Sequence, residues 1–352
     1  MMHIYLLFGI LVSNVIAQTI ISPFDSAVSI NGRFAKEADI ARASFSGVEF
    51  TIAFEGTEAS VLLKSPGNVF SVILDGNQMP PLDLSANASQ KHLIAKNLEK
   101  GIHVISVAKR TESRQGDALF KGFEIKGVPK KDALPLKPKL KIEFLGNSIT
   151  AGYGVLDPIK EHTYSPITQD VFSSYAGVAA KELNAEMRTV AFSGKGILRN
   201  NSDSGDPRTL PEFFPYISVN SKIPWDFSWQ PDIAVIELGT NDFAVSAPDS
   251  AEFVNSMVKF AKQVREKYPN AKIIITDGPM LNDFWPKGVP SLTLCKKFLD
   301  AAKSELTKQG ISVHRFSFSR QDGSLGYGAD WHPSKRQAEK NGKELAEFVR
   351  SF

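Results

Sequence analysis

The chain has a single cysteine among its 352 residues, so it has no internal disulfide bond. Cys295 falls in step with Leu299 and Leu306 on a helical stripe, which predicts a buried structural thiol rather than a nucleophile. The chain also lacks a concentrated run of lysine and arginine, and its formal net charge is only +3. Because nucleic-acid binding needs clustered positive charge, we expect no nucleic-acid partner.

Long hydrophobic runs are scarce, and the one candidate lies at the N-terminus. Residues 4–12 are almost wholly apolar, and Val15-Ile16-Ala17 then leads to Gln18. A short apolar run that ends in a small residue is typical of a secretory signal peptide, here residues 1–17. An uncleaved anchor is the alternative, but the run is short for a membrane span. We therefore expect a secreted or periplasmic protein with no membrane association after cleavage.

The length of the chain and the change in its hydrophobic pattern predict two domains. The composition, 42% hydrophobic and 22% charged, is ordinary for a globular protein, and 352 residues is long for one domain. In the first part, apolar residues such as Phe50, Ile52 and Phe54 alternate with period two, and Asp75-Gly76 marks a turn. No long helical stripe interrupts this pattern, which predicts a β-sandwich of about eight strands over residues 18–128.

A proline-rich stretch follows and separates the strand-rich part of the chain from a part in which strands and helices alternate. Residues 129–139 contain three prolines and four lysines, which is typical of a stiff, solvated linker. Over residues 140–352, strands are expected at Ile142–Leu145, Met187–Phe192, Ile233–Leu238, Ile273–Asp277 and Ile311–Phe316. Helices are expected at 174–183, 249–268, 294–306 and from Ser334 onward. Together these elements predict a three-layer α/β/α domain with a mostly parallel five-stranded sheet. Its long insertions, 155–171 and 198–231, are of a length that is usually functional.

Polar residues follow three of the expected strands, and more precede the last helix. In chain order they are Gly146-Asn147-Ser148, Ser193-Gly194-Lys195-Gly196, Gly239-Thr240-Asn241-Asp242 and Asp330-Trp331-His332-Pro333. The carboxyl ends of parallel strands meet at one edge of a doubly wound sheet. We therefore expect these four segments to converge on one crevice.

The chemistry that these residues support is acyl transfer. A serine hydroxyl is a poor nucleophile at neutral pH and needs a base, and His332 is the natural base for Ser148. The oxygen that becomes negative on the attacked carbonyl needs fixed donors. The backbone N–H groups of Ser148 and Gly194 and the side-chain amide of Asn241 are the expected oxyanion hole.

The four segments resemble, in order and spacing, the four blocks of the SGNH (GDSL-type) hydrolases. With the β domain in front, the phrases Ser193-Gly194-Lys195-Gly196 and Leu198-Arg199-Asn200 resemble carbohydrate esterase family 2. This resemblance implies an N-terminal jelly roll, no metal or other cofactor, and a nucleophilic serine. It also implies an acetylesterase that removes O-acetyl groups from plant cell-wall polysaccharides, with a preference for the sugar 6-hydroxyl.

The sequence departs from the pattern of these hydrolases at two positions. Asn147 stands where the first block usually has aspartate, and little loss is expected because that residue is not the nucleophile. The wider superfamily has its acid three residues before the histidine, where this chain has Ala329, and Asp330 lies two before. Some of the related esterases orient the imidazole with a main-chain carbonyl. Asp330 is therefore expected as the third catalytic member, through either its side chain or its backbone oxygen.

Aromatic and polar residues beside these segments are candidates for binding a sugar. The flat indoles of Trp285 and Trp331 would suit the apolar face of a pyranose, although both could instead pack loops. Arg199 could hydrogen-bond a sugar or brace its loop. The expected partner is an acetylated polysaccharide or oligosaccharide, and the expected oligomeric state is a monomer.

Two other functions remain open from the residues alone. One is an SGNH hydrolase of the lipase or thioesterase kind, which a wide apolar acyl groove would favour. The other is a carbohydrate-binding protein whose hydrolase domain is inert. The intact set of four segments argues against the second alternative.

Overall fold

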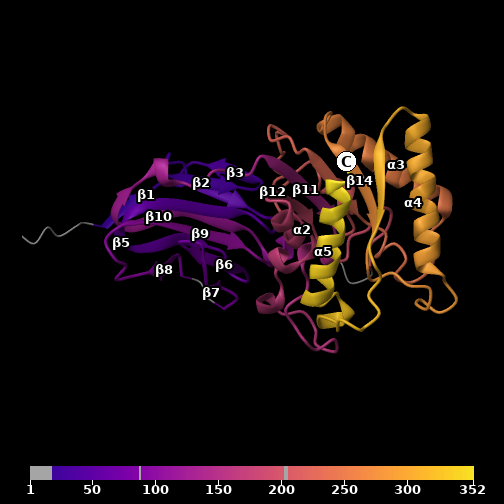
Figure 1. The fold of residues 1–352 in the computed structure, drawn as a ribbon, viewed down its shortest axis with the longest axis horizontal. Coiled ribbons are helices and arrows are strands. Elements are labelled where there is room, and N and C mark those ends of the chain that lie inside the picture. The colour runs from indigo at the N-terminus through magenta and orange to yellow at the C-terminus, as the bar shows by residue number, and fades with distance from the viewer. Residues whose placement is uncertain (1–17, 87–88, 202–204) are drawn as a thin grey trace, which may run out of the picture.

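The computed structural model describes residues 18–86, 89–201 and 205–352, which form two sheet-based domains side by side (Figure 1). The expected signal peptide, residues 1–17, lies outside the described residues. Within those residues, no helix combines the length and the apolar character that a membrane span requires.

The N-terminal domain is antiparallel throughout its described pairings. Its strands are β1 (Gln18–Ile21), β2 (Val28–Asn31), β3 (Phe34–Glu37), β4 (Ile40–Ala43), β5 (Glu49–Lys64), β6 (Val69–Leu74), β7 (Asn77–Asp83), β8 (Lys91–Ala95), β9 (Ile102–Lys109) and β10 (Ala118–Pro129). The ten strands compare with about eight expected, and short strands such as β2, β3 and β4, with four residues each, show no long alternation. The long strand β5 pairs with β10 and β9 on its two sides and carries the buried Phe50, Ile52 and Phe54.

The C-terminal domain has a five-stranded sheet in the order β12-β11-β13-β14-β15, and all four pairings are parallel. Its strands are β11 (Leu140–Gly146), β12 (Ala185–Ala191), β13 (Ile233–Glu237), β14 (Lys272–Asp277) and β15 (Val313–Ser317). Its α-helices are α1 (Ser148–Ala151), α2 (Tyr175–Glu182), α3 (Ser250–Lys267), α4 (Ser291–Lys308) and α5 (Lys335–Arg350).

The helices cover both faces of this parallel sheet (Figure 1). Helices α2 and α5 pack together on one face, and α3 and α4 pack together on the other. Cys295 lies on the buried side of α4, and burial raises the pKa of its thiol. The expected three-layer α/β/α architecture is therefore confirmed, with a sheet that is wholly rather than mostly parallel.

Buried polar contacts join the two domains. Strand β10 ends at Pro129 and β11 begins at Leu140, so the proline-rich segment lies between the two sheets. The Arg33 guanidinium of the β domain makes two hydrogen bonds to the Glu143 carboxylate on β11, at 3.0 and 2.9 Å. Neither side chain is exposed at all. A shift of one domain against the other would separate the two partners and leave each as an uncompensated buried charge. The pair therefore fixes the orientation of the domains.

Candidate active site

Ser148 lies at the first position of α1, directly after β11. The turn into this short helix is tight, and a Cβ on Gly146 would come within 2.0 Å of the Thr150 hydroxyl oxygen. The Asn147 side chain caps the helix by accepting a hydrogen bond from the Ile149 N–H at 2.9 Å. The glycine and the cap together place the serine at the carboxyl edge of the sheet.

The surroundings of Asn147 explain why an asparagine suits the position where aspartate is usual. Its amide nitrogen donates to a carboxyl oxygen of Glu237 at 3.3 Å, and Thr150 donates to the other oxygen at 3.1 Å. Burial raises the pKa of Glu237 to about 8. An aspartate at position 147 would set a second carboxyl against a buried one, whereas the amide supplies a donor.

His332 faces Ser148 directly. Its Nε2 atom lies 2.9 Å from the Ser148 Oγ, and its Nδ1 atom lies 3.1 and 3.2 Å from the backbone oxygens of Ala329 and Asp330. Carbonyl oxygens only accept hydrogen bonds, so Nδ1 carries the proton and Nε2 is free to accept from the serine hydroxyl. This is the tautomer that a general base for serine requires.

The turn before His332 has a strained backbone. The 3-10 helix η7 (Ala329–Trp331) contains Asp330 at φ +48° and Trp331 at φ +59°, a left-handed region that non-glycine residues rarely adopt. The insertion 155–171 supports this conformation, because the N–H groups of both residues donate to backbone oxygens of His162 and Lys160. The strain turns two carbonyl groups toward the imidazole.

The Asp330 carboxylate does not reach His332. It accepts a hydrogen bond from the Tyr153 hydroxyl at 2.5 Å, and the Tyr153 ring stacks on the imidazole with centroids 4.3 Å apart. Of the two routes expected for Asp330, the geometry matches the backbone oxygen. Tyr153 comes from the Gly152-Tyr153-Gly154 loop and carried no signal in the sequence, because its partner lies 177 residues away.

The surroundings keep the imidazole neutral. Burial is the largest influence on the pKa of His332 and lowers it to about 4, against opposing contributions from the Ala329 oxygen and the Asp330 charge. A histidine with this pKa is unprotonated at neutral pH and able to accept a proton from Ser148.

Gly194 and Asn241 line the same crevice as Ser148 and His332. Gly194 has φ +80°, which favours glycine, and the Asn241 amide nitrogen is held by the Lys195 carbonyl at 2.8 Å. The amide has two hydrogens, so one remains for a ligand. The crevice has a volume of about 570 Å³, which is within the range of small-molecule sites. Its other lining residues are Arg114, Tyr153, Ser193, Asn201, Thr240, Phe243, Ala244, Val245, Met280, Leu281, Asn282, Trp285 and Asp330.

Asp242 and Arg199 brace the loop that follows Gly194. The Asp242 carboxylate accepts from the backbone N–H groups of residues 197, 198 and 199 at 2.8 to 3.0 Å. The Arg199 guanidinium donates to the Asp242 carbonyl at 2.7 Å and to Ser246. Arg199 is not among the described residues that line the crevice, so its sugar-binding role stays a prediction.

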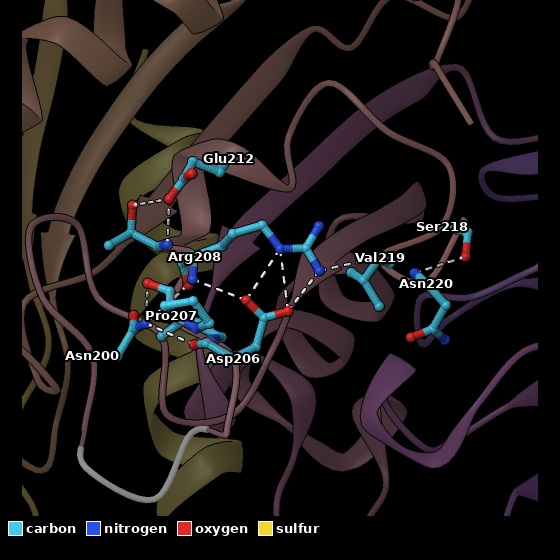
Figure 2. Close-up of polar contacts among 10 residues, drawn as sticks. Asn200, Asp206, Pro207, Arg208, Glu212, Ser218, Val219 and Asn220 are labelled. Atoms are coloured by element: carbon cyan, nitrogen blue, oxygen red, sulfur yellow. Dashed lines mark hydrogen bonds and ion pairs between the residues drawn. The ribbon is translucent and has the colours of Figure 1, made fainter. Parts of the chain in front are cut away.

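The insertion 198–231 is internally braced as well, as Figure 2 shows. The Arg208 guanidinium pairs with the Asp206 carboxylate at 2.6 Å and donates to the Val219 carbonyl at 3.0 Å. The Asn200 amide nitrogen contacts three successive carbonyls, those of residues 206–208, while its oxygen accepts from the Gly196 N–H. The insertion thereby supports the loop that carries Gly194.

The two candidate indoles differ in position. Trp285 lines the crevice with 69% of its surface exposed. Trp331 is half-exposed, but its ring lies against Lys160, whose ammonium is 4.1 Å from the ring centroid, and against Tyr327. Trp331 is absent from the described lining of the crevice. The structure thus brings Trp285, but not the Trp331 ring, to the edge of the candidate site.

The β domain also contributes to the crevice, which the sequence did not indicate. Arg114, in the 3-10 helix η1 (Ser113–Gln115) after β9, lines the crevice together with the strand-end residues of the other domain. Its neighbour Glu112 contacts Ser193. No local pattern could have revealed this, because it depends on how the two domains pack.

A parallel sheet with a serine and a histidine at its carboxyl edge, behind an antiparallel β domain, defines a two-domain hydrolase of the SGNH type. Comparison with protein families agrees with this class. Residues 144–339 match the GDSL-like Lipase/Acylhydrolase family, and residues 30–135 match the Carbohydrate esterase 2 N-terminal family. The chain therefore belongs to carbohydrate esterase family 2, as the sequence resemblance predicted.

Individual relatives support the same assignment. The chain is 38% identical over 308 residues to the cellulase/esterase CelE of Acetivibrio thermocellus, covering 86% of this chain but only 37% of that protein. It is 26% identical over 314 residues to an acetylxylan esterase / glucomannan deacetylase of Cellvibrio japonicus, covering 88% and 84% of the two chains. A family two carbohydrate esterase from Clostridium thermocellum, solved in complex with cellohexaose, superposes with a TM-score of 0.85 at 35% identity. That match covers 92% of this chain and 98% of the solved one.

Proposed function

We propose that this protein is a secreted carbohydrate O-acetylesterase that removes acetyl groups, at the sugar 6-hydroxyl, from plant cell-wall polysaccharides such as acetylated xylan or glucomannan. The observation that carries the proposal is the 2.9 Å contact between Ser148 Oγ and a His332 imidazole whose Nδ1 is held by two carbonyls. The names of the relatives support the substrate class.

The reaction proceeds through an acetyl-enzyme. His332 Nε2 takes the proton as Ser148 Oγ attacks the acetyl carbonyl, and the resulting oxyanion lies against the N–H groups of Ser148 and Gly194 and the Asn241 amide. The protonated Nε2 then gives its proton to the departing sugar oxygen. Water then loses a proton to Nε2 and attacks the acetyl carbonyl. The bond between that carbon and Ser148 Oγ breaks, Oγ takes the proton back from Nε2, and acetate leaves.

The character of the crevice favours a short acyl group on a polar substrate. Its lining combines apolar residues such as Met280 and Leu281 with polar residues such as Asn282 and Thr240. The exposed Trp285 at its edge offers a flat apolar surface of the kind that a pyranose ring covers. A long-chain lipase would need a wide apolar groove instead.

The deciding experiment compares wild type with Ser148→Ala on acetylated xylan and glucomannan, with acetate release as the readout. Wild type should release acetate and the variant should not. Equal release by both, or no release by folded wild type, would contradict the proposal, and the second outcome would favour an inert carbohydrate-binding protein. Regiospecifically acetylated sugars test the 6-hydroxyl preference, and thioesters and long-chain esters serve as competing substrates.

A further inference from the structure

Glu112 is a buried acid of the β domain that reaches into the hydrolase domain. It lies between β9 and η1 and is completely buried. One carboxylate oxygen accepts the Ser193 backbone N–H at 2.6 Å, and the other accepts the Ser193 hydroxyl at 2.6 Å. Ser193 immediately precedes Gly194, whose N–H is assigned to the oxyanion hole. The contact therefore falls one residue from the acyl-transfer chemistry.

A second tether runs from Glu112 to the nucleophile turn. Its backbone N–H donates to the Gln169 side-chain oxygen at 3.3 Å, and the Gln169 amide nitrogen donates to the Ala151 carbonyl at 3.3 Å. Ala151 ends the helix α1 that Ser148 begins. One residue of the β domain thus connects the loop of Gly194 with the helix of Ser148.

The segment that carries Glu112 is itself fixed by a buried lysine. The Lys109 ammonium donates to the carbonyls of Thr111 and Glu112 at 2.7 and 3.0 Å, and its side chain is fully buried. Placing a lysine and a glutamate together in the interior costs desolvation that a simple apolar interface would avoid. The arrangement holds the two carboxylate oxygens of Glu112 rigidly toward Ser193.

We propose that Glu112 is a positioning residue, which holds Ser193 so that the Gly194 N–H points at the developing oxyanion, and that the β domain is therefore part of the catalytic machinery. The inference rests on the proposed function, because it assigns Glu112 a role in the same acyl transfer. Oxyanion donors act on the transition state more than on the bound substrate. Loss of Glu112 should therefore lower kcat and leave KM nearly unchanged.

The test is the steady-state hydrolysis of 4-nitrophenyl acetate and acetylated xylan by the full chain carrying Glu112→Gln. A glutamine keeps the size of the side chain but offers one acceptor in place of two. We expect kcat to fall about 30-fold, with KM within about twofold of wild type. Glu99→Gln, an exposed acid of the same domain, is the matched control and should retain wild-type kcat and KM.

Ser193→Ala is the second variant, because it removes the hydroxyl contact with little effect on packing. We expect a fall in kcat of about fivefold at unchanged KM, and the double variant should lose no more than Glu112→Gln alone, since both changes act on one contact. The inference is overturned if folded Glu112→Gln keeps the wild-type kcat, or if only KM changes. It is also overturned if the losses of kcat in the double variant are additive. If Glu112→Gln does not fold, wild-type kcat in Ser193→Ala overturns it. Wild type that hydrolyses no ester would instead refute the proposed function.

Discussion

The carboxylate of Asp330 is hydrogen-bonded to the Tyr153 hydroxyl at 2.5 Å and not to the His332 imidazole. His332 Nδ1 is held by the backbone oxygens of Ala329 and of Asp330 itself. The acidic side chain makes no hydrogen bond to the histidine and acts on it through its charge and through the Tyr153 ring that stacks on the imidazole. The geometry is that of a Ser–His dyad with a backbone-oriented base.

Asp330→Asn tests this arrangement. Asparagine tolerates the left-handed backbone found at position 330, and it preserves the carbonyl that accepts from Nδ1. We expect kcat to fall less than about tenfold, whereas the same change in a side-chain triad costs about 10⁴. His332→Ala should lose at least about 10³ because it removes the base itself. A loss in Asp330→Asn as large as in His332→Ala would show that the carboxylate is the third member.

The low pKa of His332 predicts the pH dependence of the reaction. Only the neutral imidazole accepts the Ser148 proton, so activity is present above the pKa and is lost as the pH falls through it. Burial lowers the pKa of His332 to about 4, so the acidic limb of kcat/KM should have its midpoint near that value. Circular dichroism at each pH separates this effect from acid unfolding. A midpoint near 6.5, the usual value for histidine, would contradict the burial argument.

Much of the hydrolase domain could be predicted from the sequence because its signals are local. Buried parallel strands such as β13 and β14 are continuous apolar runs, and the residues after them meet at one edge whatever the loops do. The convergence of Ser148 and His332 followed from that rule. Short strands such as β2, β3 and β4 are hard to predict individually, because four residues carry too little periodicity to distinguish a strand from a loop.

The orientations of the side chains at the site could not be predicted from the sequence. The orientation of Asp330 depends on a positive φ and on Tyr153, which comes from a distant loop. The contact of Glu112 with Ser193 depends on how the sheets of the two domains pack together. The sugar-binding roles of Trp285, Trp331 and Arg199 stay predictions, as do the domain boundaries and the monomeric state.

The buried pair Arg33–Glu143 predicts strong coupling between the domains. The Tyr268 hydroxyl also donates to Glu143, at 2.6 Å, so the acid is fully partnered only while Arg33 is present. Arg33→Met should destabilise the protein by about 3–5 kcal/mol, because it leaves an uncompensated buried carboxylate. Adding Glu143→Leu should restore part of that loss, because it removes the unpaired carboxylate but leaves the buried Tyr268 hydroxyl without its acceptor. Urea unfolding measures both, and additive losses in the double variant would contradict the pairing.

Trp285 and its neighbour Phe284 form a matched pair for testing substrate binding. Both side chains are largely exposed, 69% and 78%, but only Trp285 lines the crevice. If the indole supports a sugar ring, Trp285→Ala should raise KM for acetylated glucomannan about five- to tenfold, since a stacked aromatic contributes about 1 kcal/mol beyond its buried area. KM for 4-nitrophenyl acetate should stay unchanged, because that ester lacks the sugar, and kcat should be retained on both substrates. Phe284→Ala should match wild type throughout. Equal effects of the two variants, or equal effects of Trp285→Ala on both esters, would mean that Trp285 does not bind the carbohydrate.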